Sequence, residues 1–130
     1  MLDAFLTTPP FLSQQEIDRR LARTHAAKIA LDRIVEIIRE APDAAPSLEL
    51  RRFLWSLFNG RHLLNLWRLR HALDRQQSGW ATEVLTAWMN GHVSEEHLRR
   101  ALTDSGEMER CDAAARAEMS SNDSRTPSTP

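Results

Sequence analysis

The class of fold is decided by residues 13–40, which read SQQEIDRRLARTHAAKIALDRIVEIIRE. Ser13 stands three residues before Glu16. This is the spacing of a capping box, in which a hydroxyl and a carboxylate each satisfy a free backbone amide at a helix start. Leucine, isoleucine and valine then recur at intervals of three and four residues, which is typical of one buried helix face. Ala41-Pro42 ends the pattern. At 1.5 Å per residue, we expect one helix of roughly 40 Å.

A helix of that length is long for a chain of 130 residues. A protein of this size forms one domain with a modest core. We therefore expect the N-terminal half of the helix either to protrude or to pair with a second copy, which would give a homodimer through helix 13–40.

The rest of the chain divides into shorter helices at residues that favour helix starts and stops. Ser47 and Ser94 are suited to cap helix N-termini. Asparagine and glycine tolerate the left-handed conformation that ends many helices, and they occur at Asn59-Gly60, Asn90-Gly91 and Gly106. The expected helices cover about 48–58, 62–75, 80–89 and 95–103. The prediction is an all-α fold of about five helices, with the long N-terminal helix packed on two short helical hairpins.

The two ends of the chain differ in composition from the middle. Pro9-Pro10 disfavours helix, so residues 1–12 are predicted to form an irregular N-terminal arm. Residues 13–106 form the predicted helical domain. Residues 120–130, SSNDSRTPSTP, are polar and contain proline. We therefore expect residues 107–130 to be a weakly helical to disordered tail.

Composition argues against several classes of protein. The single cysteine, Cys111, excludes an internal disulfide and fits a reducing compartment. The N-terminus lacks the basic region of a secretory signal. No apolar run approaches the roughly 20 residues that a membrane helix needs. We therefore expect a cytoplasmic protein without a membrane partner.

Positive charge is concentrated in residues 51–75, which hold six arginines and one aspartate, a net charge of +5 in a chain whose total is −1. On a helical wheel for residues 62–75, at 100° per residue, apolar side chains gather on one side and are expected to face the core: Leu63, Leu66, Trp67, Leu69 and Leu73. Basic side chains lie within about 80° of one another on the far side: Arg61, Arg68, His71 and Arg75. Arg51 and Arg52 are expected to extend this basic face from the preceding helix.

Three interpretations of the basic face stay open. Arginines along one helix face contact successive phosphates of a nucleic acid and release counterions. The same face suits an acidic protein partner. It is also compatible with a surface that only water covers, and the total charge of −1 favours this over a dedicated nucleic-acid module.

Arg70 differs from the other arginines of this segment. Arg70 falls among the leucines of the wheel, and Asp74 follows one helical turn later. We expect these two to form a structural ion pair that holds the helix in place. Trp67 is predicted to lie in the core. The sequence does not determine the exposure of Trp55, Trp80 and Trp88, and an exposed tryptophan would mark an interface.

Catalytic and metal-binding patterns are not evident in the sequence. His92 and His97 flank two glutamates, but zinc-binding motifs of this kind space their histidines by four residues and not five. Neither of the glycine-rich phosphate-binding motifs occurs. Arg110 is the only basic residue next to Cys111, so the cysteine lacks the surroundings of a catalytic thiol. We therefore predict no enzymatic activity, no bound metal and no cofactor.

One stretch resembles a known family. An aromatic-rich helix ends in Asn59-Gly60, and Leu66-x-x-Leu69-Arg70-x-x-Leu73-Asp74 follows. This pattern, which covers roughly residues 50–103, resembles a small bacterial family of unknown function found on plasmids, integrative elements and proteobacterial chromosomes. The sequence departs from the family pattern between Gly60 and Leu66. The resemblance implies a compact, bacterial, cytoplasmic helical module and implies no activity.

These observations together predict a non-enzymatic accessory or regulatory protein that acts by binding another protein, and the resemblance is compatible with a gene on a mobile element. The alternative is a nucleic-acid-binding protein that uses the basic face of residues 61–75.

Overall fold

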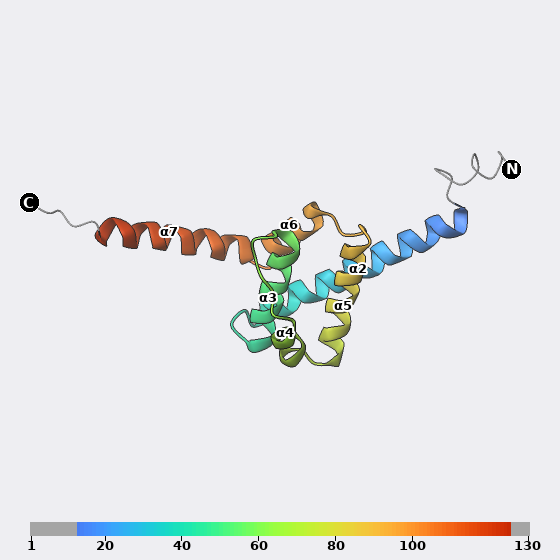
Figure 1. Ribbon diagram of the computed structural model, residues 1–130, viewed down its shortest axis with the longest axis horizontal. Helices are drawn as coiled ribbons and strands as arrows, with labels where there is room; N and C mark the ends of the chain where they lie inside the picture. Colours follow the sequence, from blue (N-terminus) through green and yellow to red (C-terminus); the bar gives the residue numbers. More distant parts are fainter. Residues whose placement is uncertain (1–12, 126–130) are drawn as a thin grey trace, which may run out of the picture.

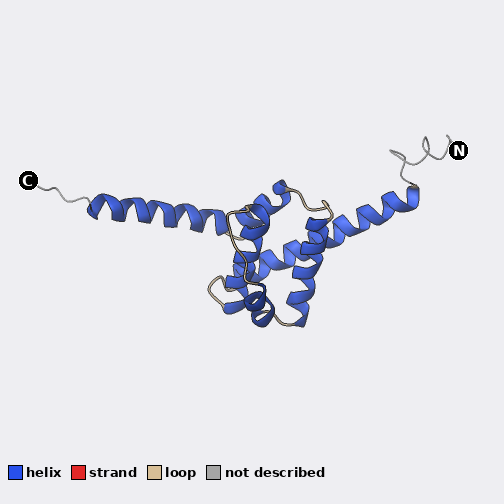
Figure 2. Cartoon of the chain, in the orientation of Figure 1, coloured by secondary structure: helices blue, strands red, loops and turns tan. Residues whose placement is uncertain are grey.

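The computed structural model describes the backbone of residues 13–125 and the side chains of residues 13–121 (Figures 1 and 2). Six helices follow one another in this part of the chain: α2 (Gln14–Glu40), α3 (Ala45–Phe58), α4 (Leu66–Ala72), α5 (Arg75–Met89), α6 (Glu95–Asp104) and α7 (Glu107–Arg125). No strand occurs between residues 13 and 125. The predicted all-α class and long first helix are confirmed, with six helices where about five were expected. The predicted arm at residues 1–12 lies outside the described residues.

Helix α2 begins where the capping pattern predicted. The Ser13 hydroxyl accepts a hydrogen bond from the backbone amide of Glu16 at 3.1 Å. The buried residues of α2 begin only at Ala27, and Figure 1 shows the N-terminal half of the helix extending beyond the other helices. This half therefore protrudes, which is one of the two arrangements expected. Leu21, on this half, is 64% exposed. The homodimer through helix 13–40 stays a prediction.

The core forms where α2 meets the shorter helices. α2 packs most extensively against α5, and also against α3 and α6. Large side chains that are almost completely buried come from all four helices: Ile34, Ile38, Leu50, Phe53, Leu54, Val84, Leu98 and Leu102. Burying one such side chain contributes about 1.5–3 kcal/mol. The shared core therefore fixes the positions of α3 and α5, between which α4 lies in sequence.

Helix α3 begins earlier than predicted. Its first residue is Ala45 and its N-cap is Ala44, so the prediction that Ser47 caps this helix is wrong. Pro46 is tolerated in the first helical turn because the amide that it lacks has no partner there. Ser47 is buried inside the helix and donates its hydroxyl hydrogen to the carbonyl of Ile37 at 3.2 Å. The serine therefore ties the start of α3 to the last turn of α2.

The last two helices are joined by a left-handed glycine. The Ser94 hydroxyl caps α6 as predicted, accepting a hydrogen bond from the His97 amide at 3.2 Å. Gly106 follows α6, and its φ of 82° is in the left-handed region of backbone conformation, which favours glycine. α7 then runs to Arg125, so the part of the predicted weakly helical to disordered tail up to this residue is helical. Figure 1 shows α7 projecting from the other helices on the side opposite the N-terminal half of α2.

None of the six described helices combines the length and the apolar character needed to cross a membrane.

Candidate binding surface around helix α4

The segment between α3 and α5 contains a short helix flanked by two capping residues. The Asn65 side chain accepts a hydrogen bond from the Arg68 amide at 3.1 Å and starts α4. Asp74 starts α5: its carboxylate accepts from the Gln77 amide at 2.8 Å, and its own amide donates to the Gln77 side chain at 3.0 Å. The predicted helix over 62–75 is therefore wrong, because α4 covers only Leu66–Ala72.

Three apolar side chains of this segment face solvent, and we call them the α4 surface. Leu63 is 91% exposed, Trp67 is 67% exposed and Leu66 is 63% exposed. The prediction that these three face the core is wrong, because a two-turn helix turns only a narrow strip inward. That strip consists of the buried Leu69, with the half-buried Leu73 just after the helix.

Trp67 is held in place on the surface by His71. The two rings stack with centroids 4.1 Å apart and planes 25° apart. The His71 Nδ1 lies 2.8 Å from the Trp67 carbonyl oxygen. Because a carbonyl oxygen only accepts, this ring nitrogen is the donor. The His71 ring therefore stacks on the indole, which remains 67% exposed.

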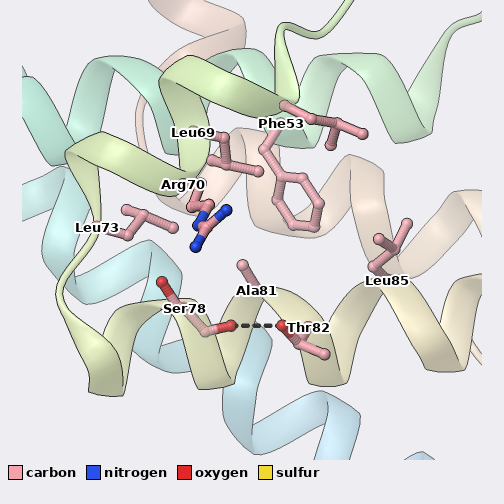
Figure 3. A pocket seen from close by; sticks show the side chains of 9 residues that line it. Phe53, Leu69, Arg70, Leu73, Ser78, Ala81, Thr82 and Leu85 are labelled. Carbon is pink, nitrogen blue, oxygen red and sulfur yellow. Dashed lines mark hydrogen bonds between the residues drawn. The ribbon is translucent and has the colours of Figure 1, made fainter.

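A pocket of about 280 Å³ opens between α3, α4 and α5 (Figure 3). Most of its lining is apolar, and the nine lining residues are Phe53, Leu66, Leu69, Arg70, Leu73, Ser78, Ala81, Thr82 and Leu85. Arg70 is exposed, and Figure 3 shows its guanidinium directed into the space between α4 and α5. Leu66 belongs both to this pocket and to the α4 surface.

The predicted ion pair between Arg70 and Asp74 is not formed, and this prediction is wrong. Asp74 follows the end of α4, where its carboxylate caps α5. No carboxylate between residues 13 and 121 lies within 4 Å of the Arg70 guanidinium. The i to i+4 spacing brings two side chains together only if the helix continues through both residues.

The predicted basic face is divided among three structural elements. Arg61 lies in the turn after α3, Arg68 and His71 lie on α4, and Arg75 is the first residue of α5. The prediction that they share one face of a continuous helix is therefore wrong. All four are exposed. Among the described side chains, no carboxylate pairs with Arg61, Arg68 or Arg75.

Arg51 and Arg52 do not extend this basic region. The Nε of Arg51 donates to both carboxylate oxygens of Glu107, at 2.9 and 2.8 Å, and its Nη1 donates to the Pro42 carbonyl at 3.0 Å. Arg52 donates to Glu49 at 2.6 Å. Arg51 therefore has a structural role: it joins the first turn of α7 to α3.

Glu107 is the buried centre of a cluster that also contains Arg110 and Trp55, which are both partly exposed. Its side chain is 7% exposed, and it accepts hydrogen bonds from Arg110 Nε at 2.8 Å and from the Trp55 indole at 3.2 Å. Burial by itself raises the pKa of this carboxyl. The hydrogen bonds from Arg51, Arg110 and Trp55 and the positive charge of Arg51 outweigh burial, so the pKa lies below its ordinary value of 4.5.

We expect the stabilising effect of Glu107 to depend on pH. A carboxyl whose pKa is lower in the folded state stabilises the fold fully above its unfolded pKa and loses this effect as the pH falls through its folded pKa. The difference in unfolding free energy between the wild type and Glu107→Gln should therefore be largest above pH 4.5 and shrink below it. Urea unfolding at pH values on both sides of 4.5 measures this, and a difference that grows on acidification would contradict it.

Among the described residues, no group of three or more His, Cys, Asp or Glu side chains is placed to hold a metal ion. His97, which follows His92 in the sequence by five positions, completes the capping box of α6 through Ser94. Cys111 is exposed on α7.

Comparisons of the chain with family models, with curated proteins and with solved structures found no match. The resemblance to the small bacterial family therefore stays a prediction.

Sequence reasoning missed two features of this region. Asp74-x-x-Gln77 is a capping signal that predicts a helix start at Arg75 and thus a break before it. The exposure of Trp67 had no comparable signal, since a wheel does not show which apolar residues the rest of the fold covers.

Proposed function

We propose that this protein is a non-enzymatic accessory or regulatory protein of the bacterial cytoplasm that binds another protein through the α4 surface. The partner that fits this surface is a segment that combines apolar and acidic side chains. The observation that carries the proposal is the exposure of Leu63, Leu66 and Trp67, close together in sequence, on a short, capped helix and the turn before it.

The apolar part of the proposal rests on the cost of exposing these side chains to water. Keeping a side chain such as leucine exposed forgoes about 1.5–3 kcal/mol of burial energy. Contiguous exposed apolar residues commonly mark interaction sites, and tryptophan is enriched among residues that dominate binding energy. Stacking on His71 holds Trp67 in one position, which lowers the entropic cost of binding.

The acidic part rests on the charges around this surface. Arg61, Arg68 and Arg75 come from the turn before α4, from α4 itself and from the start of α5, and they lack carboxylate partners among residues 13–121. Carboxylates of the partner would form ion pairs with these three arginines. Such complementarity speeds association and selects the partner more than it adds affinity.

The test compares proteins captured from a lysate of the native host by matched variants. We expect Leu63→Ser/Trp67→Ser to retain its fold, with a change in unfolding free energy of about 0.5 kcal/mol or less, because both side chains are exposed. We also expect it to capture at least about tenfold less of the specific partner, as the loss of a central aromatic residue implies. Quantitative mass spectrometry measures the enrichment.

The control is Met89→Ser/Met119→Ser, which changes two methionines, 71% and 70% exposed, on α5 and α7. It removes exposed apolar surface away from α4 and should capture the partner as the wild type does. Equal capture by both double variants, or no protein retained by the wild type, would contradict the proposal.

Nucleic-acid binding is the alternative, and it is favoured by the arginines that lack carboxylate partners among residues 13–121. If it is correct, Arg61→Glu/Arg68→Glu/Arg75→Glu should lose affinity for a duplex DNA or RNA oligonucleotide in fluorescence anisotropy. The slope of log affinity against log salt should also fall by about 1 for each phosphate that the variant no longer binds. The control is Arg23→Glu/Arg100→Glu/Arg116→Glu, which changes the net charge equally at other exposed positions. A wild type without affinity at low salt excludes the alternative.

A further inference from the structure

The pocket between α3, α4 and α5 has a continuous apolar floor. Phe53 is completely buried, and Leu69 and Ala81 are 7% and 5% exposed. Leu73 and Leu85, both half-buried, form parts of its walls. A water-sized group occupies roughly 30 Å³, so the volume of about 280 Å³ accommodates about nine such groups. This volume suits a short hydrocarbon chain and is too small for most cofactors.

Polar groups are concentrated on one side of this apolar space. Figure 3 shows the Arg70 guanidinium, from α4, directed toward Ser78 on α5, with Leu73 beside it. The Thr82 hydroxyl already donates to the Ser78 carbonyl at 2.7 Å. The hydroxyl of Ser78 and the guanidinium of Arg70 form no hydrogen bond with any side chain or backbone group of residues 13–121. Arg70 and Ser78 therefore line the same apolar pocket from two helices, and neither side chain has an acceptor within this part of the chain.

We propose that this pocket binds a small amphipathic monocarboxylate, whose apolar chain of about eight carbons lies over Phe53, Leu69 and Ala81 while its carboxylate pairs with Arg70. The planar guanidinium presents two parallel N–H groups that match the two oxygens of a carboxylate. Because Arg70 is exposed, the charged end of the ligand stays near solvent and only its chain is buried. A cationic ligand of the same length would place its charge against the guanidinium.

This proposal goes beyond the protein-binding function and can be tested separately from it, although Leu66 belongs both to the pocket and to the α4 surface. Trp67 and Leu63 do not line the pocket. Ligand binding should therefore persist in the Leu63→Ser/Trp67→Ser variant even if that variant captures no partner. Conversely, a wild type that captures a partner but binds no carboxylate would leave the protein-binding function intact.

The experiment titrates the protein with octanoate, octan-1-ol and octylammonium and follows the methyl resonances of the leucines by NMR. We expect octanoate to bind about threefold more tightly than octan-1-ol, because the contact with the exposed guanidinium is bidentate but screened by solvent. Octylammonium should bind most weakly. The shifts should be largest at the four leucines that line the pocket: Leu66, Leu69, Leu73 and Leu85.

Two matched variants make the assignment specific. Arg70→Gln keeps a long polar side chain and should abolish the preference for octanoate over octan-1-ol. Arg68→Gln removes the same charge from an exposed position of α4 that does not line the pocket, so it should keep the preference. Equal effects of the two variants, shifts centred on other leucines, or no octanoate binding at millimolar concentration would overturn the proposal. A partner peptide that competes for the pocket more strongly than octanoate would also overturn it, because the carboxylate would then belong to a protein.

Discussion

Replacing Glu107 with alanine is expected to lower the free energy of unfolding by about 3 kcal/mol. This is the lower end of the range found when one member of a buried ion pair is removed. The Glu107 side chain is 7% exposed, and it accepts hydrogen bonds from three donors that come from α3 and α7. Without it, Arg51, whose side chain is 20% exposed, keeps its charge in a partly buried site where the main counter-charge is gone. The Trp55 indole also loses its acceptor.

Urea unfolding followed by circular dichroism measures this effect, with Glu36→Ala as the control. Glu36 pairs with Arg33 at 3.1 Å, but both side chains are more than half exposed, at 57% and 53%. Exposed pairs of this kind contribute about 0.5 kcal/mol or less. If the two variants lose the same stability, the cluster around Glu107 does not hold α7 to α3 as the geometry implies.

Phe53→Ala is expected to have the largest effect of any single core substitution, about 3–5 kcal/mol. Phe53 is the largest of the side chains that are almost fully buried. It also forms part of the floor of the pocket between α3, α4 and α5. Its removal leaves a cavity that merges with that pocket. The neighbouring side chains then have few atoms to pack against if they move into the cavity, so little of the lost stability is recovered. Thermal and urea unfolding both report the loss.

Phe58→Ala tests whether burial, and not aromatic character, produces this effect. Phe58 is half-buried at the end of α3. Its ring and that of Trp55 form a T-shaped pair with centroids 6.0 Å apart, and the Arg99 guanidinium carbon lies 5.7 Å from the Phe58 ring centroid. Because less of its area leaves water on folding, we expect the removal of Phe58 to cost about half as much as that of Phe53. A larger loss at Phe58 than at Phe53 would contradict this description of the core.

Local signals in the sequence predict those parts of the fold that local interactions determine. Ser13 and Ser94 start helices as expected, because an N-cap hydrogen bond involves only residues three positions apart. The break before α5 is equally local, but the apolar periodicity across residues 62–75 obscures the capping signal of Asp74-x-x-Gln77. Where the two signals conflict in this chain, the cap and not the periodicity determines the boundary of the helix.

Interactions between residues that are far apart in sequence cannot be predicted from local signals. Arg51 and Glu107 are 56 residues apart, and nothing near either residue identifies the other as its partner. The sequence therefore suggests a basic face for Arg51, although its charge is already neutralised inside the fold. The same limitation applies to Trp67, because its exposure depends on which helices pack on α4. Exposed apolar side chains and arginines without carboxylate partners become recognisable only once the tertiary packing is known.

The direction of α7 depends on the contacts of its first turn, made by Glu107, Met108 and Arg110. After its first turn α7 is exposed on all sides up to residue 121, so packing does little to orient the rest. Its 19 residues form a rod about 28 Å long. If the contacts of Glu107 changed the direction of the helix axis by a few degrees, the far end of α7 would therefore move by ångströms. The few contacts of that first turn therefore set the direction in which the whole helix points.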